Sequence, residues 1–407
     1  DVTFVANPAP TDGYQSLAVM NLSTGAPSTI LAVGFRPTQI AFTKDETHAF
    51  AVTEDGISVI DLSAAQPVMV RQDPLLAPLT LAVGDASTPD AGSAADGAAA
   101  GDGGTGDARD AGLTIDAGSP TSPTPDVSFT PDGAYALVRQ DGVSAITIDA
   151  LATGTLTTVP LASAPTDLTI APAGDFAIAV LRDTSTVVEI PLPGAVTNPS
   201  AVTSIPVPGQ TIGRALVSAD EKSVVLFTTV APVDSLTVLT LGASPTARTV
   251  PMHAAVQAVF PTADGKYAVV LHQPPAASNG VEGAFSIVPI AESLPAVIQS
   301  LPAPPIAVAL SNDRAIVSTS DGQSTFGLYM ILMPSLEVKP YTLASPPIAV
   351  GIAAGAGRGY VAQDYSEGRI TFVDLSEGGV PDGGQGFTAR TITGFELSAG
   401  IVVGPDQ

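Results

Sequence analysis

A unit of about 40 to 48 residues recurs along this 407-residue chain and constrains its fold more than any other feature. Each copy contains a short apolar strand, a turn, a second strand, a tight turn and a third strand, and a fourth strand follows. The first internal copy, 37–62, reads PTQIAFTKDETHAFAVTEDGISVIDL. Further copies cover 125–148, 165–190, 212–241, 255–290, 304–333 and 347–375. Four-stranded repeats of this period are typical of β-propeller blades.

Asp-Gly pairs mark the turns of these units. They stand between the second and third strands at 55–56, 141–142 and 321–322, and between the first and second strands at 132–133 and 264–265. An Asp-Gly pair flanked by β-prone runs predicts a hairpin loop in which both central residues have positive φ. A helical alternative fails, because no window keeps apolar residues at i, i+3 and i+4 and Pro recurs too often.

The two ends of the chain are predicted to share one blade. Residues 2–7, 16–22 and 28–33 resemble the second, third and fourth strands of a blade that lacks its first, and 397–407 resembles a lone first strand. Joining them would close the ring and protect its exposed edges. With the seven internal units, the sequence predicts an all-β propeller of eight four-stranded blades. A seven-bladed ring is the alternative if the unit at 212–251 is irregular.

The repeats also resemble a known family. The segments GYVAQDYSEGRITFVDLSEG (359–378), FTPDGAYALVRQDGVSAI (129–146) and AFAVTEDGISVIDLSAA (49–65) are similar to the YVTN-type propeller repeats of bacterial and archaeal surface proteins. The resemblance covers nearly the whole chain outside one insertion. It implies a propeller fold but no single function, because such blades serve binding, adhesion and, in some lactone-opening enzymes, catalysis. The chain has no Trp and so departs from tryptophan-aspartate repeats.

An insertion at 84–123 interrupts an otherwise single domain, 1–407. It is rich in Asp, Gly and Ala and has no aromatic residue, so it cannot bury enough apolar surface to offset the entropy of ordering. We expect a flexible surface loop between the last strand of one blade and the first strand of the next. Calcium binding is the alternative, although its Asp spacing lacks the alternating pattern of a calcium loop. No other cofactor is expected.

Charge and composition exclude several classes of function. The net charge of −24 repels phosphate backbones, so nucleic acid is not expected as a partner. No apolar run approaches the roughly 18 residues of a membrane span. The absence of Cys excludes disulfides and thiolate chemistry. Because the chain begins at Asp1 rather than Met, we expect a processed protein that is secreted, periplasmic or on the outer cell surface, after removal of a signal peptide or lipid anchor.

Catalytic motifs are missing from the sequence. There is no G-x-S-x-G elbow, no G-x-G-x-x-G after a strand and no Walker motif. Of the three His, His48 and His272 fall in or beside second strands, where such residues are usually structural, and His253 lies at a blade junction. With one His at the rim and no Cys, no zinc site is expected.

The mouth of the central channel is the best candidate for a binding site. Aligning the first strands by their hairpin Asp places four polar residues in one register: Gln39, Asp126, Asp167 and Arg214. Gln257 joins them if its blade carries one extra residue before its turn. The other blades place Ala307, Ala349 and Gly400 there, so the mouth is polar on one side and bare on the other.

Two readings of these polar residues stay open. They either face channel water or form an off-centre pocket of Arg214, Asp167 and Asp126, with Arg36 and His253 at its rim. In such a pocket the arginines would bind a carboxylate or sugar acid, or they would pair with the aspartates.

We therefore expect a non-catalytic secreted or cell-surface propeller that binds a protein or extracellular-matrix partner. One alternative is a lactonase- or lyase-like enzyme that uses Asp126, Asp167, Arg214 and His253 in the channel. Another is a subunit of an extracellular assembly that self-associates through 84–123 or 377–386. The sequence does not predict the oligomeric state.

Overall fold

The computed structural model describes most of the repeats and little of the chain ends. The described residues are 2–3, 15–21, 26–43, 45–64, 66–75, 125–252, 254–272, 281–333, 335–353, 357–375 and 389–394. The insertion at 84–123, the closing strand predicted at 397–407 and His253 lie outside them. Within them the chain is almost entirely β-structure, with one short helix, α1 (Gly194–Thr197). No helix in this part is long and apolar enough to cross a membrane.

The strands form eight antiparallel sheets, which we number as blades 1 to 8 in chain order. Blade 1 holds β1 (Val2–Thr3), β2 (Ser16–Asn21) and β3 (Ala26–Ala32). Blade 2 holds β4 (Gln39–Phe42), β5 (His48–Thr53), β6 (Gly56–Asp61) and β7 (Val68–Asp73). Blade 3 holds β8 (Asp126–Phe129), β9 (Tyr135–Arg139), β10 (Ala145–Ala150) and β11 (Thr155–Pro160). Blade 4 holds β12 (Asp167–Ile170), β13 (Phe176–Leu181), β14 (Thr186–Pro191) and β15 (Thr203–Pro206).

The remaining blades repeat the same meander. Blade 5 holds β16 (Arg214–Val217), β17 (Ser223–Phe227), β18 (Ser235–Thr240) and β19 (Thr246–Pro251). Blade 6 holds β20 (Val256–Pro261), β21 (Tyr267–His272), β22 (Gly283–Pro289) and β23 (Val297–Leu301). Blade 7 holds β24 (Pro305–Leu310), β25 (Arg314–Ser320), β26 (Phe326–Leu332) and β27 (Glu337–Thr342). Blade 8 holds β28 (Pro347–Ala353), β29 (Arg358–Gln363), β30 (Arg369–Asp374) and β31 (Ala389–Thr393).

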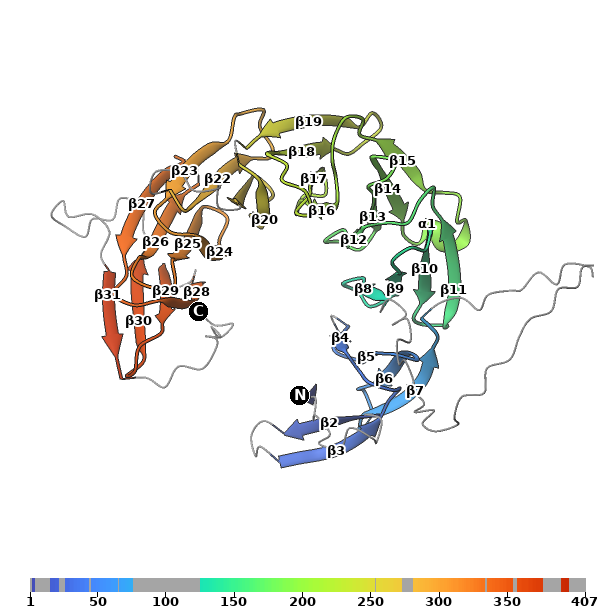
Figure 1. Ribbon diagram of the computed structural model, residues 1–407. Helices are drawn as coiled ribbons and strands as arrows, with labels where there is room; N and C mark the ends of the chain where they lie inside the picture. The colour runs from blue at the N-terminus through green and yellow to red at the C-terminus, as the bar shows by residue number, and fades with distance from the viewer. Residues whose placement is uncertain are drawn as a thin grey trace, which may run out of the picture.

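The blades follow one another around an arc, with first strands on the inside and fourth strands on the outside (Figure 1). Blades 1 and 8 stand at its two ends. Among the described residues blade 1 has three strands, which agrees with the prediction of an N-terminal blade without a first strand of its own. The unit at 212–251 forms a regular four-stranded blade, so the count is eight and the seven-bladed alternative is wrong.

Apolar side chains fill the spaces between neighbouring blades. One cluster joins Leu137 and Ile148 of blade 3 to Ala177 and Leu181 of blade 4, and similar clusters follow at the next interfaces. A second strand has a sheet neighbour on each side and a blade over each face, so all six residues of β13 are buried. These strands therefore read as continuous apolar runs, whereas the outer strands alternate.

The Asp-Gly turns occur where the sequence predicts them, but their geometry differs from the prediction. Positive φ falls on the glycine alone: Gly142 has φ 78° and Gly322 has φ 74°, whereas Asp141 and Asp321 do not adopt positive φ. The carboxylate explains the difference at Asp321. Its Oδ1 accepts the backbone N–H groups of residues 323, 324 and 325 at 2.8 to 2.9 Å, which closes the turn through the side chain.

Candidate binding site at the channel mouth

The four polar residues predicted in one register do share it. Gln39, Asp126, Asp167 and Arg214 are the first residues of β4, β8, β12 and β16. Each pairs with a residue at or near the end of the second strand of its blade. Because these first strands line the inside of the arc, the residues stand at successive positions around the channel (Figure 1).

Gln257 reaches the mouth through a β-bulge. The register of β20 with β21 shifts between Val256 and Ala258, so the predicted extra residue exists and is Gln257 itself. Ala258 takes the paired position next to it. A bulge leaves one residue without a cross-strand partner and turns the strand locally, so Gln257 is exposed.

The side of the mouth expected to be bare is apolar instead. Ala307 and Ala349 do hold the paired positions of β24 and β28, as predicted. Both strands, however, carry the same bulge as β20, and the bulged residues are Ile306 and Ile348. Their side chains are 48% and 43% exposed. The expectation of a bare side was wrong because the alignment by hairpin Asp has no place for a bulged residue.

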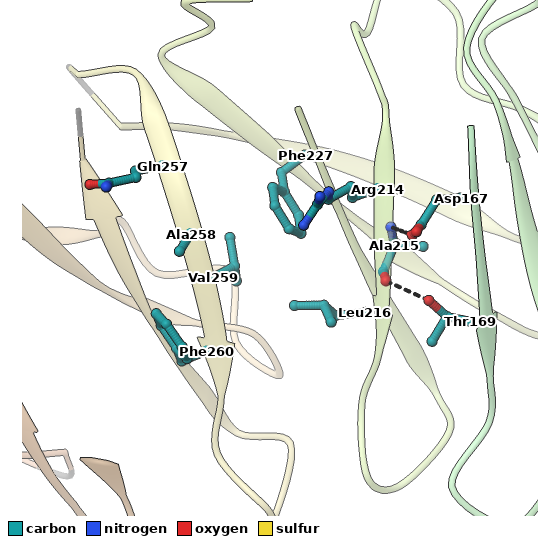
Figure 2. A pocket seen from close by; sticks show the side chains of 10 residues that line it. All are labelled: Asp167, Thr169, Arg214, Ala215, Leu216, Phe227, Gln257, Ala258, Val259 and Phe260. Carbon is teal, nitrogen blue, oxygen red and sulfur yellow. Dashed lines mark hydrogen bonds between the residues drawn. The ribbon is translucent and has the colours of Figure 1, made fainter. Parts of the chain in front are cut away.

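A pocket of about 300 Å³ opens between the first strands of blades 4, 5 and 6 (Figure 2). Its polar lining is Asp167, Thr169, Arg214 and Gln257. Its apolar lining includes Leu216, Phe227, Val259 and Phe260. The pocket thus combines three of the predicted site residues with an apolar wall, which is the usual make-up of a small-ligand site.

Asp167 is held by the next blade. Its Oδ2 accepts the backbone N–H of Ala215 at 2.8 Å, and Thr169 Oγ1 donates to the carbonyl of the same residue at 2.9 Å (Figure 2). These two bonds link β12 to β16. Burial raises the pKa of Asp167, while the Ala215 N–H and the charge of Arg214 act in the opposite direction. The Asp167 carboxylate therefore links blade 4 to blade 5 in the wall of the pocket.

Arg214 and Gln257 are the free polar groups of the pocket. Within the described part of the chain, neither side chain makes a hydrogen bond or an ion pair. Arg182 of blade 4 reaches the chain just before β16, where its Nε donates to the carbonyl of Ile212 at 3.3 Å.

Arg139 was missed by the sequence reasoning. Its guanidinium donates to Asp126 at 3.4 Å, to Asp141 at 2.5 Å and to the carbonyl of Pro165 at 3.2 Å. Asp126 thus pairs with Arg139 of its own blade, and no ion pair joins it to Arg214. The signal was present in the sequence, because Arg139 lies directly opposite Asp126 across the first hairpin of blade 3.

The other candidates lie outside the pocket. Arg36 has φ 49°, pairs with Glu54 at 3.1 Å and packs over the ring of Phe35. His253 falls outside the described residues. His272 is fully buried, with Nε2 2.6 Å from Ser286 Oγ and Nδ1 3.1 Å from the carbonyl of Ala254, and burial lowers its pKa. Its expected structural role is confirmed.

The described residues contain no group of three or more His, Asp or Glu side chains arranged to hold a metal ion. The calcium alternative concerns the insertion at 84–123, which lies outside the described residues.

Comparisons with known proteins concern the fold. No family model and no curated protein matches the chain. The crystal structure of a eukaryotic initiation factor is 10% identical, covers 93% of this chain and 84% of its own, and has a TM-score of 0.50. Dihydro-heme d1 dehydrogenase NirN in complex with DHE is 13% identical over 94% and 72%, with a TM-score of 0.49.

The WD40 repeats of RRP9 are 11% identical over 81% of this chain and 88% of theirs, with a TM-score of 0.42. At such identities a likeness concerns architecture and not activity. The resemblance to YVTN-type repeats stays a prediction, because no family model matches. The arrangement of its sheets makes the chain a β-propeller with eight blades.

Proposed function

We propose that this protein is a non-catalytic binding propeller whose channel-mouth pocket binds a carboxylate group of its partner. Arg214 carries the proposal, because its side chain is exposed and has no ion pair with any described residue, in a chain with 39 acidic and 15 basic residues. Guanidinium groups bind carboxylates through strong charge-assisted hydrogen bonds. Gln257 adds an amide donor, and the apolar wall adds a surface for the body of the ligand.

A binding role suits the pocket better than catalysis. General acid–base catalysis needs a group that is free to exchange a proton with the substrate. Asp167 is the only carboxyl group among the described residues that line the pocket, and one of its oxygens already accepts the Ala215 N–H. Asp126, the other carboxylate proposed for an enzyme, is paired with Arg139.

We also propose that the protein works outside the cell as a member of the YVTN-type surface propellers. The segments at 49–65, 129–146 and 359–378 support this, since they are similar to repeats of that family. Protease treatment of intact source cells tests it: loss of the protein without lysis is expected. Survival of the protein until the cells are opened would contradict an exposed location.

The pocket is tested with 3-phenylpropionate, a carboxylate on an apolar body, and its neutral amide as a control ligand. Calorimetry should show saturable binding of the acid and much weaker binding of the amide. Arg214→Gln should weaken binding of the acid about tenfold or more. Arg36→Gln is the matched control, because Arg36 is also exposed but lies outside the pocket, and it should leave affinity unchanged.

Equal binding of acid and amide would contradict the proposal. Turnover of a lactone panel that disappears in Asp167→Asn would replace it with the enzyme alternative.

A further inference from the structure

Three consecutive first strands carry the same bulge. In β20, β24 and β28 the extra residue is the second of the strand, and the residues extruded are Gln257, Ile306 and Ile348. The first strands of blades 2 to 5 pair without any shift. The bulges therefore belong to one side of the ring and give it a row of exposed side chains.

This row continues from the pocket. Gln257 lines the pocket, and Ile306 and Ile348 stand at the matching positions of the next two blades, which contact each other through β24 and β28 (Figure 1). Exposed isoleucines are costly to hydrate, so a ligand that buries their side chains gains affinity. A ligand that begins at Arg214 and follows the row would meet a cation, then an amide, then two apolar side chains.

We infer that this mouth binds the C-terminal segment of a partner protein, with the terminal carboxylate at Arg214 and apolar side chains against Ile306 and Ile348. The inference rests on the proposed function and names the chemistry of the partner.

Charge favours a single terminal carboxylate. With a net charge of −24 the propeller repels segments that carry several acidic side chains. One carboxylate at the end of an otherwise apolar segment satisfies Arg214 without adding further repulsion. The Arg214 guanidinium has no competing partner among the described residues.

The bulges favour a peptide over a fatty acid. At each bulge the extra residue, Gln257, Ile306 or Ile348, is left out of the cross-strand register, so its backbone polar groups lie at an interrupted ladder. The main chain of a peptide that crosses these positions offers donors and acceptors to such groups, whereas a hydrocarbon chain offers none.

The test uses the whole protein and a fluorescent hexapeptide, Gly-Ser-Gly-Val-Ile-Leu, with a free C-terminus. Fluorescence anisotropy should show tighter binding than that of 3-phenylpropionate, and at least tenfold weaker binding of the amidated peptide. A double variant, Ile306→Ser with Ile348→Ser, should weaken peptide binding about tenfold and leave 3-phenylpropionate binding unchanged. Ile30→Ser is the matched control, because Ile30 is 75% exposed on the outer strand β3.

The outcomes separate this inference from the proposed function. If 3-phenylpropionate binds at Arg214 but the double variant keeps full peptide affinity, the inference is wrong and the pocket stands. If neither probe binds, both are wrong. Dodecanoate that binds as tightly as the peptide would replace the partner with a lipid. A change in sedimentation of the double variant without any ligand would replace it with a second copy of this chain.

Discussion

The two sides of the channel mouth differ by one residue per strand. In blades 3 to 5 the first strand starts with Asp126, Asp167 or Arg214 and pairs without interruption. In blades 6 to 8 the same ladder position holds an alanine, and a bulged residue stands before it. Side chains alternate between sheet faces with a period of two, so one added residue changes what is exposed at the mouth without moving the strand below it.

The largest expected effect comes from removing one residue on each side. Deleting Leu168 from β12 would bring Asp167 into the buried position of Leu168 between blades 3 and 4. We expect this deletion to lower the free energy of unfolding by about 3 kcal/mol or more. Deleting Ile306 would only remove a bulge, because the pairs Pro305–Thr319 and Ala307–Ser318 already flank it. We expect the deletion of Ile306 to lower the free energy of unfolding by less than about 1.5 kcal/mol. Urea unfolding measures both.

If both deletions lowered the free energy of unfolding equally, the two sides of the mouth would not differ in this way. The bulged residue would then be as essential to its blade as a paired core residue.

Titration should also distinguish the two sides. Asp149 of β10 is fully buried and its carboxylate accepts no hydrogen bond from a donor among the described residues, while nearby Arg71 pairs with Asp73. Burial, together with the charge of Asp73, raises the pKa of Asp149 to about 7. Between pH 4 and 7 the folded state then binds more protons than the unfolded state, so the free energy of unfolding falls as pH rises. Asp149→Asn should remove roughly 2–4 kcal/mol of this fall.

Asp321 of blade 7 gives the opposite sign. Three backbone N–H groups hold its pKa well below the usual range, so its contribution is present above pH 4 and is lost as pH falls. Asp321→Asn should lower stability at pH 7 and should lower it less at pH 2, where part of the contribution has been lost. Thermal unfolding across pH 2–8 checks both variants. An Asp149→Asn profile parallel to that of the wild type would show that Asp149 is ionised in the folded protein.

The smallest effect sharpens the comparison within the apolar side. Ser286 of blade 6 is buried and hydrogen-bonds His272. Thr319 of blade 7 is buried at the position that corresponds to His272, and its hydroxyl has no hydrogen-bond partner in the described part of the chain. Ser286→Ala should cost about 1–3 kcal/mol, because it leaves a buried ring nitrogen unpaired. Thr319→Val should be neutral or stabilise by up to about 1 kcal/mol. Chemical denaturation compares them, and a costly Thr319→Val would point to a buried water at that hydroxyl.

Local patterns determined much of this protein from the sequence. The repeat, the turns at Asp-Gly, the three N-terminal strands of the first blade and the shared register of Gln39, Asp126, Asp167 and Arg214 all follow from residues within one blade. Strand periodicity and turn chemistry depend on near neighbours in the chain, so they can be read without knowing how the blades pack.

The packing between blades and the strand pairing within each blade decided which of these side chains are exposed and which groups contact one another. The exposure of Ile306 and Ile348 depends on a register shift in each strand, and an isoleucine at these positions does not predict such a shift. The hydrogen bond that Asp167 accepts from the Ala215 N–H depends on the neighbouring blade, and so does the burial of Asp149. Such features join residues that the sequence keeps far apart, so only the tertiary structure brings together the free cation, the amide and the apolar row from which binding is proposed.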